Sequence, residues 1–178
     1  MPEFRKGLNI IYTGNGKGKT TAALGLMLRA WGDGFNVAGI QFIKSEDSVK
    51  GEAAAFQKMG IPFESMGLGF YFGDSASQQT HRDAALSAWK HAQDLITSQK
   101  YDMLLLDEIT YVFHFGWIEC SEWIDWVKNN KPDQMHLILT GRDAPQELIN
   151  FADLVSEVRE IKHPYQTSRL PAQLGIEY

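Results

Sequence analysis

Eight consecutive residues constrain this chain more than any other feature of its sequence. Residues 13 to 20 read Thr-Gly-Asn-Gly-Lys-Gly-Lys-Thr, between an apolar run, Leu8–Tyr12, and an apolar segment with helical spacing, Thr20–Trp31. The pattern is that of a phosphate-binding loop, G-x-x-x-x-G-K-[ST], with Thr13 in place of the first glycine. Because this motif requires a strand before it and a helix after it, we interpret the segment as a phosphate loop. The alternative is an ordinary glycine-rich turn.

The residue types in this loop suit a polyphosphate. Gly14, Gly16 and Gly18 allow backbone N–H groups to turn inward and approach phosphate oxygens, because no Cβ stands in the way. The N-terminus of the following helix adds about half a positive charge. Lys19 adds a full charge, and Thr20 offers a hydroxyl group to magnesium. We therefore expect the loop to hold the phosphates of magnesium-bound ATP.

Short apolar runs alternate with helical patterns along the chain, which indicates an α/β fold with a mostly parallel sheet and helices on both faces. Most runs are apolar at successive positions, as expected of strands covered on both sides. In such a fold, ligands bind beyond the carboxyl ends of the strands. The expected strands are Leu8–Tyr12, Asn36–Phe42, Met103–Leu106, His136–Leu139 and Leu154–Val158. The expected helices are Thr20–Trp31, a long one through Ala85, Trp89, Ala92 and Ile96, Ser121–Lys128, and one whose first turn begins at Pro145.

Composition narrows the class of protein. Apolar residues make up 44% of the 178 residues, which fits one soluble globular domain over residues 1 to 178. A net charge of -5, with the basic residues scattered, argues against a nucleic-acid binder. Cys120 is the only cysteine, so no disulfide forms within one chain. With no long apolar stretch and no signal peptide, a cytoplasmic protein is expected.

Polar residues follow three of the expected strands. Asp107 and Glu108 come directly after Met103–Leu106, where a carboxylate faces a phosphate loop and binds magnesium directly or through water. The alternative is two solvated charges. Lys44 closes the second strand and Arg142 closes a later one. An arginine at that place is able to clamp phosphate through two parallel hydrogen bonds, whereas the alternative for both cations is an ordinary surface position.

The segment Gly67–Gly73 reads GLGFYFG, with three consecutive aromatic residues between glycines. Three neighbouring rings do not all point into one core, whatever the local backbone geometry. One interpretation is a hydrophobic loop packed at the edge of the domain. The other is a mobile aromatic wall for a large flat ligand, since rings offer much contact area at a low cost in entropy.

Taken in order, these motifs resemble the corrinoid adenosyltransferases of the cobalamin biosynthesis and salvage type. The resemblance runs from about Gly7 to Tyr178, which is nearly the whole chain. Many nucleotide enzymes share the phosphate loop, whereas the ordered set is specific. The matching segments are TGNGKGKTT at 13–21, QFIK at 41–44, GLGFYF at 67–72, LDEI at 106–109, LTGR at 139–142, ADLV at 152–155, Lys162-His163 and AQLGIEY at 172–178.

The resemblance implies a RecA-like P-loop NTPase fold, usually a homodimer, that acts on ATP, Mg²⁺ and a reduced corrinoid. It implies transfer of the 5′-deoxyadenosyl group to the cobalt of cob(I)alamin or cob(I)yrinic acid a,c-diamide, with release of triphosphate. A one-electron donor such as a flavodoxin would dock near the cobalt.

The same resemblance assigns roles to individual residues. Thr20 and Glu108 are expected to bind the metal, and Phe70 is expected to displace the lower axial ligand of the cobalt. Lys19, Thr20, Glu108 and Phe70 are the expected catalytic residues. The expected ATP-binding residues are Gly14, Asn15, Gly16, Lys17, Gly18, Lys19, Thr20, Thr21, Lys44 and Arg142, and those for the corrinoid or for closure of the site are Phe70, Phe72 and His163.

The chain departs from the family pattern at two places. Phe72 stands where members commonly have tryptophan, and Tyr71 where they commonly have threonine, so the aromatic wall is altered. Between His163 and Ala172 the chain reads PYQTSRLP, where the family typically has a shorter stretch with Ala-Gly-(Ile/Val)-Lys.

Two other functions stay open on the sequence alone. A P-loop ATPase or kinase cuts or moves the terminal phosphate and yields ADP, and in an ATPase Glu108 would activate water. A non-catalytic carrier of corrinoid or nucleotide binds its ligands and forms no carbon–cobalt bond.

Overall fold

A single parallel sheet organises the part of the chain that the structure describes. The computed structural model describes residues 6–43, 51–69, 71, 73 and 75–176. Within them, six strands form a sheet of order β3-β2-β4-β5-β1-β6, and every neighbouring pair is parallel. The expected α/β fold is confirmed. The strands are β1 Asn9–Thr13, β2 Val37–Gln41, β3 Phe63–Ser65, β4 Met103–Asp107, β5 His136–Thr140 and β6 Leu154–Glu157.

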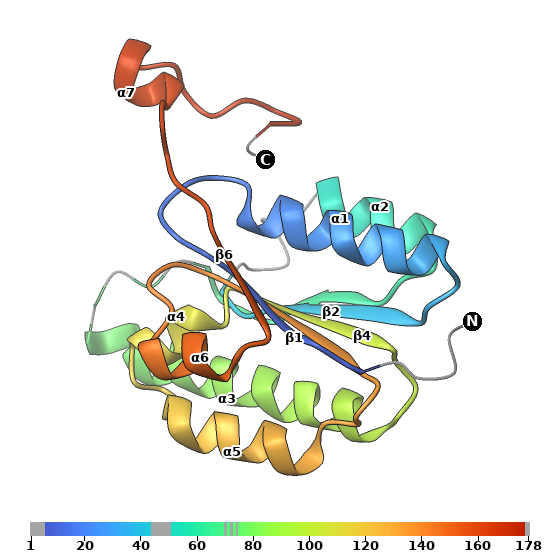
Figure 1. Cartoon of the computed structure of the whole chain (residues 1–178). Helices are drawn as coiled ribbons and strands as arrows, with labels where there is room; N and C mark the ends of the chain where they lie inside the picture. Colours follow the sequence, from blue (N-terminus) through green and yellow to red (C-terminus); the bar gives the residue numbers. More distant parts are fainter. Residues whose placement is uncertain (1–5, 44–50, 70, 72, 74, 177–178) are drawn as a thin grey trace.

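Helices cover both faces of this sheet (Figure 1). On one face lie α1 (Lys19–Gly32) and α2 (Gly51–Lys58). On the other lie α3 Ser75–Thr97, α4 Thr110–His114, α5 Cys120–Asn130 and α6 Gln146–Phe151. A last short helix, α7 (Pro164–Ser168), projects beyond the sheet, and none of its residues is buried. Within the described residues, no helix combines the length and the apolar character needed to cross a bilayer.

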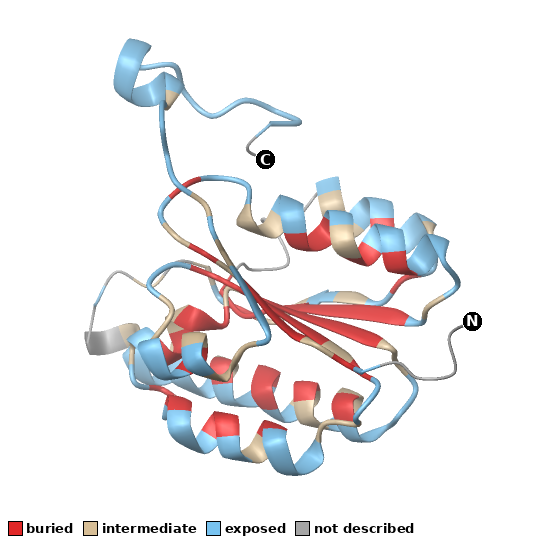
Figure 2. Cartoon of the chain, in the orientation of Figure 1, coloured by how far each residue is buried: buried red, intermediate tan, exposed pale blue. Residues whose placement is uncertain are grey.

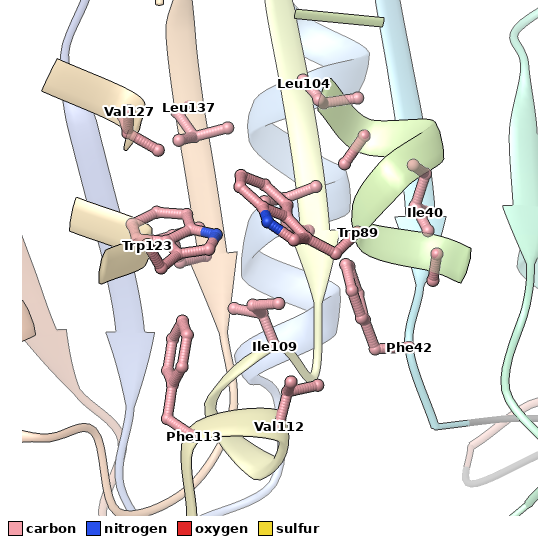
Figure 3. Close-up of a cluster of buried hydrophobic side chains, with 14 of the residues drawn as sticks. Ile40, Phe42, Trp89, Leu104, Ile109, Val112, Phe113, Trp123, Val127 and Leu137 are labelled. Carbon is pink, nitrogen blue, oxygen red and sulfur yellow. The ribbon is translucent and has the colours of Figure 1, made fainter. Parts of the chain in front are cut away.

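The alternation of side chains along β4 divides the core into two layers. Met103 and Leu105 belong to the cluster under α1 and α2, whereas Leu104 and Leu106 belong to the cluster on the opposite face. Trp123 of α5 packs in the second cluster and is 1% exposed (Figure 3). Figure 2 shows the resulting pattern, with the buried residues gathered on the sheet and on the inner sides of the helices. Because both faces are covered, the central strands read as continuous apolar runs.

The expected strands all exist, within about two residues at each end. The structure adds β3, α2, α4 and α7, none of which the sequence patterns predicted. β3 has only 3 residues and none of them is fully buried, so it carries no apolar run from which to recognise it.

Candidate functional site

The phosphate loop joins the end of β1 to the start of α1, as its motif requires. Gly14 and Gly18 have φ angles of 99° and 108°, in the left-handed region that favours glycine. Thr13, which replaces the first glycine of the motif, is the last residue of β1, and its Oγ1 accepts a hydrogen bond of 3.3 Å from the backbone N–H of Ala144. The side chain of Thr13 therefore ties the loop to the segment that follows β5.

The N–H group of Gly16 has a partner within the protein, and its role toward ATP stays a prediction. Its N–H group donates a hydrogen bond of 2.8 Å to the carbonyl of Val158, so this amide faces the segment after β6 and not a phosphate. A Cβ on Gly16 would lie 2.7 Å from the carbonyl carbon of Arg159 and 2.8 Å from the oxygen of Val158. Glycine is needed here because another stretch of backbone approaches closely.

Lys19 is the first residue of α1 and is half-buried. Its Nζ donates a hydrogen bond of 2.7 Å to the carbonyl of Gly16, which holds the side chain back along the loop. Burial lowers the pKa of Lys19, and the positive charge of Arg142 lowers it further; the carboxylates of Glu108, Asp107 and Asp143 oppose both effects. The structure therefore brings together the cation of the loop, the two carboxylates at the carboxyl end of β4 and the arginine after β5.

Asp107 lies at the centre of this edge of the sheet. It is the last residue of β4, and its side chain is 0% exposed. Its Oδ1 accepts hydrogen bonds from the hydroxyls of Thr20, at 2.9 Å, and Thr140, at 2.5 Å. Its Oδ2 accepts a hydrogen bond of 2.8 Å from the side-chain amide of Gln41. Residues of β2, β4, β5 and α1 thus fix the position of the Asp107 carboxylate.

Glu108 follows immediately but takes another direction. Its φ angle is 62°, so the chain leaves the strand at this residue. Its N–H group donates a hydrogen bond of 2.9 Å to Oγ1 of Thr140. The family resemblance implied Glu108 as the magnesium ligand beside Thr20, whereas in the structure the carboxylate that contacts Thr20 is that of Asp107. The role of Glu108 on the metal stays a prediction.

Arg142 lies at the same edge, on the exposed turn after β5. Its carbonyl accepts a hydrogen bond of 2.6 Å from the hydroxyl of Thr110, the first residue of α4. A Cβ at Gly141, where φ is 144°, would fall 1.9 Å from that hydroxyl oxygen. The Thr-Gly-Arg turn is therefore pressed against α4, which fixes the backbone of Arg142 next to the phosphate loop.

The aromatic segment begins with backbone contacts to the end of β2. The N–H of Met66 donates to the carbonyl of Gln41 at 3.0 Å, and the N–H of Gly69 donates to the carbonyl of Ile43 at 2.7 Å. A Cβ at Gly67 would lie 2.2 Å from the carbonyl carbon of Ile43, so glycine is required for this approach.

Tyr71 packs inward from this segment. Its ring centroid lies 5.0 Å from that of Phe115, 5.2 Å from that of His81 and 5.6 Å from that of Trp117. For Tyr71, the structure therefore agrees with the interpretation of this segment as a hydrophobic loop packed at the edge of the domain. Phe70, Phe72 and Lys44 lie outside the described residues, and their roles stay predictions.

His163 is placed far along the chain from the other candidates. Its Nδ1 accepts a hydrogen bond of 3.1 Å from the N–H of Tyr165, so His163 caps α7, which projects beyond the sheet in Figure 1. The part of His163 in closing the site stays a prediction.

Two residues at strand ends were visible in the sequence but were given no role in the site. Gln41 and Thr140 are each the last residue of a buried strand, at its carboxyl end, and both are buried (0% and 1% exposed). A polar residue that closes an otherwise apolar strand is the signal that would have found them, because a buried polar side chain needs a partner. The phosphate-binding role was instead assigned to Lys44 and Arg142, which follow these two strands.

Comparison with known proteins agrees with the motifs. The family model described as ATP:corrinoid adenosyltransferase BtuR/CobO/CobP matches residues 5–178. The corrinoid adenosyltransferase of Escherichia coli K12 is 37% identical over 173 residues, which cover 97% of this chain and 86% of that protein. The corrinoid adenosyltransferase of a Sinorhizobium species is 39% identical over 178 residues, covering 97% of this chain and 81% of that protein.

A solved structure supports the fold alone. The flagellar accessory protein FlaH of Methanocaldococcus jannaschii superimposes with a TM-score of 0.59 at 10% sequence identity. The match covers 86% of this chain and 72% of that one. At this identity the similarity concerns architecture, which is consistent with a RecA-like P-loop fold.

Proposed function

The chain belongs to the ATP:corrinoid adenosyltransferase family, and on that premise we propose that it transfers the 5′-deoxyadenosyl group of ATP to the cobalt of a reduced corrinoid, in the synthesis or salvage of a cobalamin. The observation that carries the proposal is structural. A phosphate loop faces a buried carboxylate at the carboxyl edge of a parallel sheet, and the chain matches the family from residue 5 to residue 178.

The phosphate loop is proposed to hold the triphosphate. Lys19 supplies the positive charge, and at its N-terminus α1 supplies backbone N–H groups and the positive end of its dipole. Asn15, Lys17 and Thr21 are exposed around the loop, and we propose that they contact the nucleotide. Gly16 contributes by its small size, since its N–H group is taken by Val158.

A magnesium ion fits the oxygen atoms present. Thr20 Oγ1 and Asp107 Oδ1 are 2.9 Å apart. Adjacent corners of an octahedron with metal–oxygen distances of about 2.1 Å lie about 3 Å apart, so both atoms are able to serve one ion. Magnesium usually takes one or two carboxylates together with substrate phosphates. We propose that Thr20 and the Asp107–Glu108 pair hold it, and when bound it would stabilise the charge of the leaving triphosphate.

The reaction needs little acid–base chemistry from the protein. The Co(I) corrinoid attacks the 5′-carbon of the ribose, a cobalt–carbon bond forms, and the carbon–oxygen bond to the triphosphate breaks. The electron pair of that bond leaves with the triphosphate. The task of Lys19 is to stabilise this developing charge, which suits a fixed cation in a half-buried position. Phe70 is proposed to displace the lower ligand of the cobalt, on the resemblance alone.

Other features of the proposal rest on resemblance and on the exposed tail. The family pattern supports a homodimer, a flavodoxin-like electron donor and a cytoplasmic location. Ile161, Leu174 and Ile176 are 91%, 81% and 81% exposed, which suits a tail that contacts another protein surface. A single sheet built from residues 9 to 157 supports one domain.

The test is an anaerobic reaction of the protein with ATP, Mg²⁺ and chemically reduced cob(I)alamin, followed by visible spectroscopy. The proposal expects the Co(I) spectrum to be replaced by that of an alkylated corrinoid, with Lys19→Ala inactive. A carrier would bind both compounds and leave the cobalt unalkylated.

A further inference from the structure

The side chain of Gln41 uses both ends of its amide at the metal edge of the site. Its Nε2 donates a hydrogen bond of 2.8 Å to Oδ2 of Asp107. Its Oε1 accepts a hydrogen bond of 2.9 Å from the hydroxyl of Ser65, at the end of β3. Gln41 is 0% exposed, so these partners are not exchanged for water.

The chemistry of the partners fixes which way the amide points. A carboxylate accepts hydrogen bonds and donates none, so it requires the NH₂ group of Gln41 on its side. The hydroxyl of Ser65 is free to rotate and donates to the oxygen left on the other side. The chain Ser65, Gln41, Asp107 is therefore satisfied in one orientation only.

The backbone holds the same residues in register. Gln41 pairs with Ser65 on one side and with Asp107 on the other, each in a parallel ladder. The N–H of Phe42 donates to the carbonyl of Asp107 at 3.0 Å. Gln41 thus has both its backbone and its side chain next to Asp107. A substitution that removes the side-chain amide of Gln41 would therefore affect the Asp107 carboxylate directly, while the backbone pairing of the strands is kept.

We propose that Gln41 is a positioning residue for the magnesium end of the ATP site, and that Ser65 in turn orients Gln41. By occupying Oδ2 of Asp107, Gln41 holds the carboxylate plane so that Oδ1 faces Thr20. Since residues outside the coordination sphere that orient metal ligands typically change metal affinity about 10- to 100-fold, the effect is measurable. This inference rests on the proposed metal site at Thr20 and Asp107.

The experiment measures the gain in ATP affinity that magnesium produces, by titration calorimetry with Mg²⁺ and with a chelator. Gln41→Leu removes the amide at similar volume and is expected to lose about 10-fold or more of that gain. Its ATP affinity in chelator is expected to stay within about twofold of the wild type, because Lys19 and the loop amides are untouched. Ser65→Ala, a small change on an edge strand, is expected to lose part of the gain in the same direction.

Asn9→Leu is the matched control. Asn9 is also a buried amide on a strand of this sheet (9% exposed), but it lies at the opposite edge, beside Asp153. This variant is expected to keep the full effect of magnesium on ATP affinity even if it lowers the melting temperature. A general loss of packing would therefore affect both leucine variants, whereas a loss of positioning would affect only Gln41→Leu.

The outcomes separate this inference from the one on which it rests. If the wild type gains no ATP affinity from magnesium, the metal site is wrong. If the wild type gains affinity and Gln41→Leu keeps all of it, the metal site stands and Gln41 has no positioning role. Should Gln41→Leu fail to fold, a Ser65→Ala variant with an unchanged magnesium effect overturns the inference.

Discussion

The hydroxyl of Thr20, at the start of α1, donates a 2.9 Å hydrogen bond to the carboxylate of Asp107, at the end of β4. These residues are 87 positions apart in the sequence. The contact joins the phosphate loop to the acidic end of a central strand, and it is the point at which we place magnesium.

Replacing Asp107 by asparagine tests that contact. Asparagine keeps the shape, but its amide carries less charge for a metal, so the Mg²⁺ concentration for half-maximal activity is expected to rise at least about 10-fold. Asp102→Asn is the control, because Asp102 precedes the same strand at its other end, where its side chain accepts a hydrogen bond from the N–H of Asn36. An unchanged magnesium dependence in Asp107→Asn would remove Asp107 from the metal site.

Replacing Lys19 by alanine is expected to abolish measurable ATP binding. The side chain provides the charged group of the loop, and charge-assisted hydrogen bonds are about twice as strong as neutral ones. Binding is measured by calorimetry, with Lys90→Ala as the control, since Lys90 is an exposed lysine paired with Asp94 on α3. Equal ATP affinity in Lys19→Ala and the wild type would contradict the phosphate-loop assignment.

The close approach at Gly16 predicts a stability difference between two glycines. Gly16→Ala places a Cβ 2.7 Å from the backbone of Arg159, and overpacking of this kind typically costs about 1 to 3 kcal/mol. Gly25→Ala is the matched control: Gly25 lies on the exposed side of α1 with nothing within 4 Å of an added Cβ, so alanine is expected to stabilise by roughly 0.5 to 1 kcal/mol. Urea unfolding measures both; equal stabilities would mean that the segment after β6 does not press on the loop.

The role proposed for Phe70 predicts different effects of its substitution on activity with Co(I) and with Co(II) corrinoid. Phe70→Ala is expected to spare ATP binding and activity on pre-reduced Co(I), yet to slow turnover from Co(II) with a reductant, because only the second reaction requires removal of the lower ligand. Phe35→Ala is the control, since Phe35 stacks on His136 at the amino edge of the sheet. If both cobalt substrates suffer equally in Phe70→Ala, the role is wrong.

The sequence was sufficient for the central strands and for the phosphate loop. Strands covered on both faces read as apolar runs, and β1, β2, β4 and β5 were found in this way. The edge strand β6 is mostly exposed and was indicated only by a short apolar run at its start. The half-exposed β3 has no such run, and its place beside β2 depends on contacts distant in sequence. Periodicity contains no information on those contacts.

The site was predicted less completely than the fold. The order Asp107-Glu108 does not say which carboxylate faces Thr20, because successive strand residues point to opposite faces and the end of a strand is uncertain by a residue or two. The structure decides it through the φ of 62° at Glu108, where β4 has ended. The contact of Gly16 was also not predictable, since Val158 approaches it from the segment after β6, 142 positions away (158 minus 16).

The central claim is that the triphosphate of ATP leaves whole. Phosphorus NMR of the products, after anaerobic incubation with ATP, Mg²⁺ and cob(I)alamin, tests it most directly. The proposed function predicts one equivalent of inorganic triphosphate for each alkylated cobalt and no ADP from that step. ADP as the product, with the cobalt unalkylated, would contradict it and point to an ATPase or kinase.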